Sequence, residues 1–463
     1  MSALERITAE RAAAFAETVA RERLEMLFDA DTFVEIGGFA QVDGKPCSVV
    51  CGYGAVMGGP VYAFAQDASI GGGAIGKATA AKIAKVYDMA LKTGVPVIGI
   101  YDSKGLRVSE GAEALTSVSE LLRQVSALSG VVPQISVVLG SCVGTNAMMA
   151  ISADFVVMSE KADLYATPVT VETKAGAGTA EAAAKAGVVH ILAKDDAEAI
   201  EKAKSLVSML PINNLAAAPV AAYTEVSGAE DNLRAACESI GEAKAEDIVA
   251  ALVDQDSTIE LFAQFGAGVY AALAGIEGFT VGVLATKGGA LTADDCAKMA
   301  RLVSILDAFQ IPVITLVNSA GMAEGDVIAT NARDMARLAH IYNEATTAKI
   351  SVIIGKAYGA AFVTLAAGMD YTIAWPSAVI SVLNPTAAVA FMYSERITPE
   401  QTREQVEAAY IANEASPITA AKSGCIDDVI DPAVTRPALL AALDLLSAKR
   451  VHKNPKKHSN IPL

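Results

Sequence analysis

The sequence is poor in aromatic side chains and in residues that could build a zinc site or a disulfide framework. Aromatic residues make up 5% of the 463 positions, although 53% of the chain is hydrophobic. This composition suits tightly packed layers of helices on sheets. The six cysteines include no CxxC pair and no histidine partner at ligand spacing. Structural zinc and disulfides are therefore not expected, and we interpret the cysteines as free thiols in a reducing compartment.

The chain also lacks long apolar runs and an excess of positive charge. No stretch of about 18 apolar residues is free of charged side chains, so we expect no transmembrane helix. Residues 1–15 are typical of a charged amphipathic helix without the apolar core of a signal peptide, which favours a cytoplasmic location. The net charge of −16 argues against nucleic acid or an anionic membrane as a partner. A phosphate-bearing ligand would need local positive groups or helix N-termini.

Several common catalytic motifs are missing as well. The sequence contains no GxSxG elbow, no HExxH zinc motif and no Walker A loop. Of its four histidines, two lie in the basic C-terminal tail and two lie in segments predicted to be helical. We therefore expect chemistry without a protein nucleophile or a bound metal, in which a cofactor supplies the proton acceptor.

What the chain does contain is an internal duplication. Residues 96–168 and 312–385 are two versions of one segment, about 216 positions apart. The matching positions include Ile135-Ser136 with Ile350-Ser351, Gly140 with Gly355, Gly144 with Gly359, and Asp154 with Asp370. A repeat longer than about 50 residues indicates two whole domains of one fold. We therefore predict two related sites, each placed where a strand ends in a glycine turn.

Strands and helices alternate along the first copy. The hydrophobic pattern predicts helices over residues 76–94 and 113–130, and strands over residues 95–102 and 135–141. This alternation is typical of crossover βαβ units and hence of an α/β fold.

The end of the first copy is predicted from composition. Residues 180–211 resemble one continuous helix, and the segment after them is rich in turn and linker residues. We therefore place a domain boundary near residue 225, which gives domains of residues 1–225 and 226–463.

Residues 71–76 have the GxGxxG spacing of a dinucleotide-binding turn. The run follows a predicted strand and opens a helix, as that motif requires. However, a run with this many glycines matches readily by chance, and the second copy has TKGGALT at the equivalent turn. We therefore do not predict a Rossmann site. The hypothesis that these amides face a phosphate or a thioester stays open.

The paired turns GSCVGT and GKAYGA each follow a predicted strand and precede a short helix. This geometry directs backbone N–H groups to one point, and the helix N-terminus adds partial positive charge. A developing oxyanion needs such donors, and each is worth about 3–4 kcal/mol of transition-state stabilisation. Close packing of helix on strand would also require small residues. The presence of two copies at matched positions favours a functional role.

A set of motifs lies in order along nearly the whole chain: FVEIGGFA, AFAQDASIGGGAIG, PVIGIYDSKGLRVSEG, SGVVPQISVVLGSCVG, KAYGAAF, AWPSAVISV and KKHSNIPL. Together they resemble the carboxyltransferase subunits of biotin-dependent acyl-CoA carboxylases and decarboxylases. The resemblance implies an α/β protein with two tandem crotonase-like domains of the ββα-superhelix type. It also implies that the acyl-CoA binds residues 1–225 and that biotin binds residues 226–463.

The resemblance assigns roles to the two turns. The amides of Gly144 and Thr145 match the position that stabilises the thioester enolate, and those of Ala360 and Ala361 match the position that holds biotin. Biotin would take a proton from the substrate α-carbon, and the enolate would attack released CO₂; decarboxylation is the reverse sequence. The further residues implied to contact coenzyme A or biotin are Gly72, Gly73, Lys77, Lys104, Gly105, Arg107, Gly321, Met322, Tyr358 and Gly359.

The resemblance also implies partners. No AMKM-like biotinylation sequence occurs, and the NIPL ending coincides with the usual end of the family. Biotin is therefore expected to arrive in trans on a separate carrier protein. The other implied partners are a biotin carboxylase subunit or a membrane decarboxylase subunit, within a homohexamer built as a trimer of dimers. The expected location is cytoplasmic, or membrane-associated through a partner subunit.

The chain departs from the family pattern in both turns. The DSGGAR motif of many members is DSKGLR here, so Lys104 enters the acyl-CoA side. It would pair with a CoA phosphate or a substrate carboxylate, or else remain a solvated loop lysine. The family's Gly-Gly is Gly144-Thr145, and a β-branched residue tolerates positive φ poorly. In the second copy YGGA is YGAA, and a commonly acidic position is Val363.

The sequence leaves four candidate functions. The leading hypothesis is a carboxyltransferase subunit that acts on propionyl- or methylmalonyl-CoA. The alpha subunit of a sodium-pumping glutaconyl- or methylmalonyl-CoA decarboxylase is an alternative, and a catalytically degenerate subunit of such a complex is another. A crotonase-type hydratase or isomerase is disfavoured, because such chains usually hold one domain and need a placed Glu or Asp.

Overall fold

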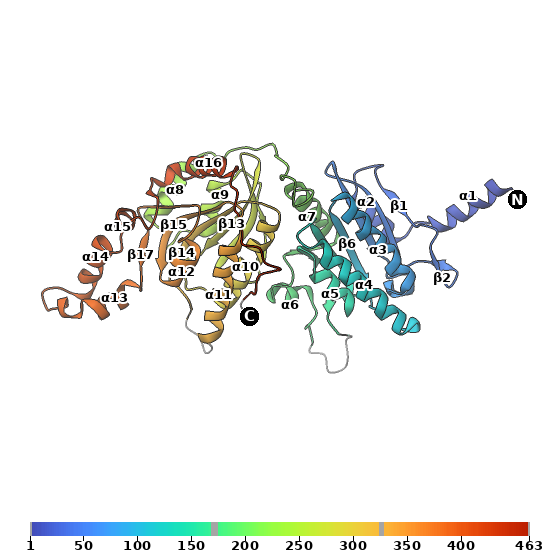
Figure 1. Ribbon diagram of the computed structural model, residues 1–463, viewed down its shortest axis with the longest axis horizontal. Coiled ribbons are helices and arrows are strands. Elements are labelled where there is room, and N and C mark those ends of the chain that lie inside the picture. Colours follow the sequence, from blue (N-terminus) through green and yellow to red (C-terminus); the bar gives the residue numbers. More distant parts are fainter. Residues whose placement is uncertain (1, 168–174, 324–327, 462–463) are drawn as a thin grey trace. The chain divides into compact units, whose positions relative to one another are not determined.

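The computed structural model describes residues 2–167, 175–323 and 328–461. The chain divides into two compact units, residues 1–219 and 220–463, each built around its own sheet (Figure 1). The boundary predicted near residue 225 lies six positions from this division, within a segment that has no helix or strand between residues 211 and 227.

The first unit contains a mixed sheet whose strands, from edge to edge, are β1 (Val34–Ile36), β4 (Val49–Val56), β5 (Gly59–Gln66), β6 (Val97–Ser103), β7 (Gln134–Val143), β8 (Phe155–Ser159) and β10 (Ile191–Ala193). The first three strands pair antiparallel, and those from β5 to β10 pair parallel. Strands β6 and β8 are buried over nearly their whole length, which explains their continuous apolar sequences. The end of β7 extends beyond β8 and pairs with β9 (Asp163–Tyr165).

The helices of the described part of this unit are α1 (Ala3–Ala14), α2 (Val19–Leu27), α3 (Lys77–Thr93), α4 (Ala112–Leu128), α5 (Thr145–Ile151), α6 (Ala180–Lys185) and α7 (Asp196–Met209). Helices α3 and α4 contact each other, and α2 contacts α7. The predicted helices over residues 76–94 and 113–130 are confirmed, and α3 ends at Gly94 in the left-handed region. A short hairpin joins β2 (Gln41–Val42) to β3 (Lys45–Pro46).

The prediction of one continuous helix over residues 180–211 is wrong. Helix α6 ends before Gly187, which has a φ of 71°. The chain then forms β10, which pairs with β8 at the edge of the sheet. Helix α7 begins after Asp195, whose side chain accepts a hydrogen bond from the amide of Glu198. Pairing with the sheet overrides the helical propensity of this alanine-rich segment.

The N-terminal helix is present where the sequence predicts it. Ser2 and Glu5 form a capping box at the start of α1. No residue of α1 is buried. Figure 1 shows α1 extending from the edge of its unit.

The second unit repeats the first strand for strand. Its sheet order is β11 (Ile259–Glu260), β12 (Val269–Ile276), β13 (Phe279–Thr286), β14 (Val313–Ser319), β15 (Lys349–Tyr358), β16 (Tyr371–Ala374) and β18 (Asp428–Val429). The end of β15 pairs with β17 (Val379–Ser381), as β7 pairs with β9. The register shifts at the same place in both copies, between Tyr101 and Ser103 and between Val317 and Ser319.

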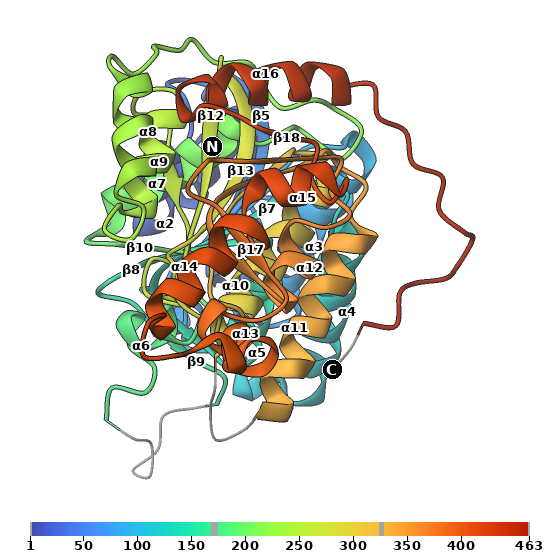
Figure 2. The ribbon, with the colours of Figure 1, turned by 90° about the vertical axis from the view of Figure 1, so that its left-hand side faces the viewer.

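The helices of this unit are α8 (Ala229–Glu238), α9 (Ala245–Leu252), α10 (Ala293–Ala308), α11 (Ile328–Glu344), α12 (Ala360–Leu365), α13 (Pro385–Met392), α14 (Arg403–Asn413), α15 (Pro417–Lys422) and α16 (Thr435–Leu446). Helices α10 and α11 correspond to α3 and α4, and they also contact each other. Helices α13 and α14 form a small additional cluster, seen side by side in Figure 2. The chain after α16 follows an extended path, and Ser459 returns to bond Glu344 at the end of α11. None of the helices in the described ranges has the length and apolar character needed to cross a membrane.

Matching helices of the two units carry a buried lysine at the same position. The ammonium of Lys82 on α3 donates to the carbonyl of Val49 at 2.8 Å. That of Lys298 on α10 donates to the carbonyls of Phe262 at 3.0 Å and Val269 at 2.7 Å. Both lysines thus tie a helix to the strand or loop that enters the sheet. Burial lowers the pKa of Lys298 to about 8.

This buried ammonium predicts a pH-dependent stability. Folded Lys298 releases its proton near pH 8, whereas an unfolded lysine does so near pH 10.4. Between these values the unfolded chain binds more protons, so stability rises with pH by up to about 1.4 kcal/mol per pH unit. We expect the wild type to gain stability over Lys298→Met across this range, in urea unfolding followed by the single tryptophan, Trp375. The exposed Lys422→Met variant is the control for the loss of one positive charge. If the difference in unfolding free energy between the wild type and Lys298→Met stays constant with pH, the lowered pKa of Lys298 is contradicted.

Candidate functional site

Both strand-to-helix turns are built on one glycine with positive φ. Gly144 ends β7 and caps α5 with a φ of 66°, and Gly359 ends β15 and caps α12 with a φ of 48°. Glycine suits such a conformation because it has no Cβ. Thr145 and Ala360 are the first helical residues. The positive φ therefore does not fall on the β-branched Thr145, and the substitution of the second glycine is sterically compatible with this turn.

The first amides of α5 and α12 are unused by the described residues. Gly144 donates to the carbonyl of Tyr165 and Gly359 to that of Ser381. The next amides, those of Thr145 and Ala360, have no acceptor within the described ranges. A helix provides no internal acceptor for its first amides, and its N-terminus attracts negative charge. These amides are therefore available to an oxygen atom of a ligand.

A second turn lies against each of these glycines. Gly105, with a φ of 107°, and Gly321, with a φ of 101°, follow β6 and β14. A methyl group added to Gly105 would lie 3.5 Å from the carbonyl oxygen of Val143, and one on Gly321 would lie 3.6 Å from that of Tyr358. The structure thus brings the predicted residues Gly105 and Gly144 together, and likewise Gly321, Tyr358 and Gly359.

The second turns supply one further free amide each. Ile75 donates to the carbonyl of Gly105 at 2.9 Å and accepts from the amide of Arg107 at 2.8 Å. The amide of Leu106 between them has no acceptor among the described residues. Met322 is placed in the same way. Leu291 donates to the carbonyl of Gly321 and accepts from the amide of Ala323, both at 2.8 Å. Each unit therefore presents free amides from two different turns. The amide of Ala361, which the resemblance also implies, likewise has no acceptor among the described residues.

The free amide of Leu106 is a feature that the sequence does not show by itself. The DSKGLR motif places Leu106 in this turn, but the resemblance assigns contacts only to Lys104, Gly105 and Arg107 there, whereas it assigns one to Met322 in the second copy. Aligning DSKGL with NSAGM places Leu106 on Met322. The duplication therefore contained a signal for this residue.

The glycine run before α3 is closed by a carboxylate. Glu110 accepts a hydrogen bond from the amide of Lys77 at 2.5 Å, so it caps the N-terminus of α3. A methyl group on Gly73 would lie 2.1 Å from the carbonyl oxygen of Asp102, which shows that Gly73 is required for close packing. Gly72, also at positive φ, accepts a hydrogen bond from the amide of Lys104 at 2.9 Å.

The cationic side chains predicted for the acyl-CoA side differ in their surroundings. Arg107 lies 3.3 Å from the carboxylate of Glu110 and is largely buried. Lys77 is exposed and lies 3.5 Å from the carboxylate of Glu113. The side chain of Lys104 packs along Gly72, and its ammonium makes no ion pair within the described ranges. Of these three side chains, Lys104 is therefore the one whose positive charge is available to a ligand beside the Gly105 turn.

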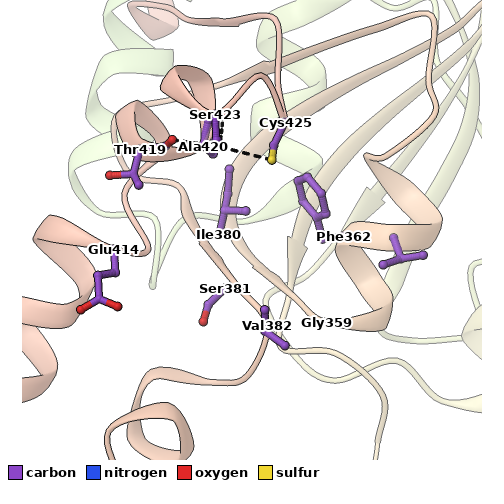
Figure 3. Close-up of a pocket in the computed structure, with 11 residues that line it drawn as sticks. Gly359, Phe362, Ile380, Ser381, Val382, Glu414, Thr419, Ala420, Ser423 and Cys425 are labelled. Atoms are coloured by element: carbon purple, nitrogen blue, oxygen red, sulfur yellow. Dashed lines mark hydrogen bonds between the residues drawn. The ribbon is translucent and has the colours of Figure 1, made fainter. Parts of the chain in front are cut away.

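A cavity of about 310 Å³ lies beside the second-unit turn (Figure 3). It is lined by Gly359, Phe362, Val363, Ile380, Ser381, Val382, Glu414, Thr419, Ala420, Ser423 and Cys425. The lining is mostly apolar. Figure 3 shows the sulfur of Cys425 at the end of its hydrogen bond with Ser423, 3.3 Å away. The described residues contain no group of three or more His, Cys, Asp or Glu side chains that could hold a metal ion.

The duplicated fold with paired backbone donors defines a class of crotonase-like proteins, and the comparisons with known proteins identify the family. The model of the carboxyl transferase domain family matches residues 13–461, so the chain belongs to that family. The chain is similar to a transcarboxylase 12S crystal structure with a TM-score of 0.90 and 32% identity, covering 99% of this chain and 95% of that one. The predicted fold class, two tandem crotonase-like domains, is confirmed by this match.

Two curated relatives show how broad the similarity is. The chain is 34% identical to the methylmalonyl-CoA decarboxylase subunit alpha of Propionigenium modestum, over 98% of this chain and 95% of that protein. It is also 34% identical to the propionyl-CoA carboxylase beta chain of Saccharopolyspora erythraea, over 96% of this chain and 90% of that protein. The predicted resemblance to both groups of enzymes is confirmed.

Cys425, which lines this cavity, is predicted to react selectively with a thiol reagent. Cys425 is exposed, whereas burial raises the pKa of Cys51 and of Cys296 to about 12. We therefore expect N-ethylmaleimide near neutral pH to label Cys425 well before these two thiols, as measured by peptide mass spectrometry. The fast phase should be absent in Cys425→Ser. Equal labelling rates for Cys425 and Cys51 would contradict the burial pattern.

Proposed function

We propose that this chain is a carboxyltransferase subunit that moves a carboxyl group between biotin on a separate carrier and the α-carbon of an acyl-CoA. Propionyl-CoA and methylmalonyl-CoA are the proposed substrate pair. The observation that carries the proposal is the repeated pair of free amides, Leu106 with Thr145 and Met322 with Ala360. Two sites that each stabilise one oxygen atom suit a reaction between two carbonyl compounds.

The first unit fits the acyl-CoA. Its two amides would donate to the thioester oxygen, which gains negative charge when the α-carbon loses a proton or CO₂. Fixed donors stabilise this enolate without reorganising water, and each contributes about 3–4 kcal/mol. Lys104 would pair with a phosphate of coenzyme A or with the substrate carboxylate. Arg107 would also contribute positive charge on the acyl-CoA side, where its guanidinium forms an ion pair with Glu110.

The second unit fits the ring system of biotin. The amides of Met322 and Ala360 would donate to its ureido oxygen, and the apolar cavity beside Gly359 would receive its hydrocarbon part. When bound, biotin supplies the nitrogen that carries the carboxyl group and accepts the α-proton. Phe362 and Val382 line this cavity and would contact the bound ring system.

The proposed assembly follows the relatives. The transcarboxylase 12S match is described as a hexamer assembly, and the relatives are named as subunits or chains. We propose a homohexamer in which the acyl-CoA half-site of one subunit meets the biotin half-site of another. A biotin carrier protein is a required partner, together with a biotin carboxylase or a membrane decarboxylase subunit. The complex would be cytoplasmic or membrane-associated through that partner.

The decarboxylase alpha subunit is the second candidate function. The similarity to the Propionigenium decarboxylase subunit supports it. That relative and the carboxylase beta chain are each 34% identical to this chain, so sequence identity does not favour one function over the other. A degenerate subunit is less well supported, since Thr145 and Ala360 both leave their amides free. Only side chains differ at these positions, whereas the donors belong to the backbone.

Carboxyl transfer to free biotin tests the proposal. We expect the purified oligomer to release CO₂ from methylmalonyl-CoA only when biotin is added, and to act less on malonyl-CoA and glutaconyl-CoA. Avidin should not inhibit, because biotin is not attached to the chain. Release of CO₂ without biotin, or no reaction with any ester that binds, would refute the function.

Proline substitution at the first helical position tests the amide donors. Proline is well accommodated at this position and lacks only the N–H group. We expect Thr145→Pro and Ala360→Pro to lower kcat by about 10²–10³. Thr145→Ala keeps the amide and should retain activity, and Ala293→Pro at the start of α10 should be neutral. Circular dichroism checks the fold, and full activity in both turn variants would exclude these amides.

A further inference from the structure

A buried polar link lies beneath the amides of the first unit. Asn146, the second residue of α5, is 1% exposed. Its Nδ2 donates to Ser103 Oγ at 2.7 Å, and its Oδ1 accepts from Gln66 Nε2 at 3.2 Å. Gln66 and Ser103 are both fully buried. All three side chains are therefore held in one orientation by mutual hydrogen bonds, since buried polar groups need partners.

The link connects the two turns that supply the donors. Ser103 Oγ also accepts from the amide of Gly105 at 3.2 Å, directly before Leu106. Gln66 Oε1 accepts from the amide of Asp102 at 3.2 Å, on the same turn. Asn146 itself directly follows Thr145 in the chain. One side chain thus fixes the helix that carries the Thr145 amide against the turn that carries the Leu106 amide.

The second unit lacks this link. Ala361 stands at the position of Asn146, and Thr286 stands at that of Gln66. Ser319 Oγ still accepts from the amide of Gly321 at 3.3 Å, as Ser103 does for Gly105. However, the methyl group of Ala361 makes no hydrogen bond, so this residue does not tie α12 to its turn. The second unit therefore adopts the same strand–turn–helix arrangement without the link.

The asymmetry matches a difference in the chemistry of the two half-sites. During the reaction the α-carbon of the acyl-CoA changes from tetrahedral to planar, and negative charge grows on the thioester oxygen. Donors that are held in place stabilise that charge most strongly in the transition state. A hydrogen-bonded network in a buried environment keeps such donors fixed, because its members cannot exchange with water.

We propose that Asn146 is a positioning residue for the acyl-CoA half-site, which fixes the Leu106 and Thr145 amides relative to each other. This inference rests on the proposed function. Asn146 does not touch the substrate, because its side chain is buried among Ser103 and Gln66. Its loss would reduce the stabilisation of the enolate and leave ground-state binding nearly unchanged. The expected effect is therefore on kcat and not on KM.

The test uses Asn146→Leu, which keeps the size of the side chain and removes both hydrogen bonds. Ser103→Ala cuts the same link by removing one oxygen atom, and the double variant tests whether both act together. Asn213→Leu is the matched control, because Asn213 donates a similar bond to the carbonyl of Gly94 outside the site. Turnover of methylmalonyl-CoA with free biotin gives kcat and KM, and hydrogen exchange follows the peptides over residues 100–107 and 316–323.

We expect Asn146→Leu to lower kcat about 10-fold or more, with KM within about 2-fold. Exchange should become faster over residues 100–107 and remain unchanged over residues 316–323. The double variant should be no slower than the worse single variant, since coupled residues are not additive. Asn213→Leu should leave kcat and both exchange rates unchanged.

Three results would overturn the proposal. These are unchanged kcat in Asn146→Leu, a rise in KM at constant kcat, or equal losses in Asn146→Leu and Asn213→Leu. If the wild type transfers no carboxyl group from any ester, the proposed function fails instead. Hydrogen exchange then decides the link by itself: faster exchange over residues 100–107 in Asn146→Leu supports it, and unchanged exchange refutes it. Ser103→Ala provides the same readout should Asn146→Leu not fold.

Discussion

The geometry of both strand–turn–helix elements depends on one backbone constraint, the positive φ of Gly144 and Gly359. Each glycine ends a strand and begins a helix within a single residue. An extended strand would pair all of its amides in the sheet, whereas this reversal leaves the first helical amides without internal partners. Because the donors belong to the backbone, their placement survives the change of neighbouring side chains. This is why Thr145 and Ala360 can occupy positions at which glycine is usual in the family.

The duplication reuses one scaffold with different polar supports. Asp102 pairs with Arg23 at 2.8 Å, and Arg23 also reaches Asp196 at 3.0 Å, so the end of β6 is tied to α2 and α7. Asn318 stands at the position of Asp102 and accepts instead from the amide of Lys356 at 3.0 Å. The Asn146 link and these ion pairs support the turn of the first unit, whereas other hydrogen bonds support that of the second. Divergence after duplication has therefore changed what holds the donors and kept the donors themselves.

Much of the fold could be predicted, because its signals are local. The apolar run at residues 95–102 and the capping Gly94 each act over a few neighbouring positions. The segment 180–211 was mispredicted for the opposite reason, since β10 exists only by pairing with β8. The free amide of Leu106 could not be predicted, because it depends on the pairing of its neighbours with Ile75, 31 positions earlier in the chain. Glu110 likewise caps a helix that begins 33 positions before it.

The sequence by itself determined the duplication, the α/β class and the two strand–turn–helix sites, because periodicity and glycine position are encoded over short stretches of chain. The tertiary structure decided which amides are free, which cations are already paired and which side chains support the turns. Those properties depend on contacts such as that between Gln66 and Asn146, 80 positions apart. Hydrogen-bond partners at that distance are brought together only when the sheet has formed.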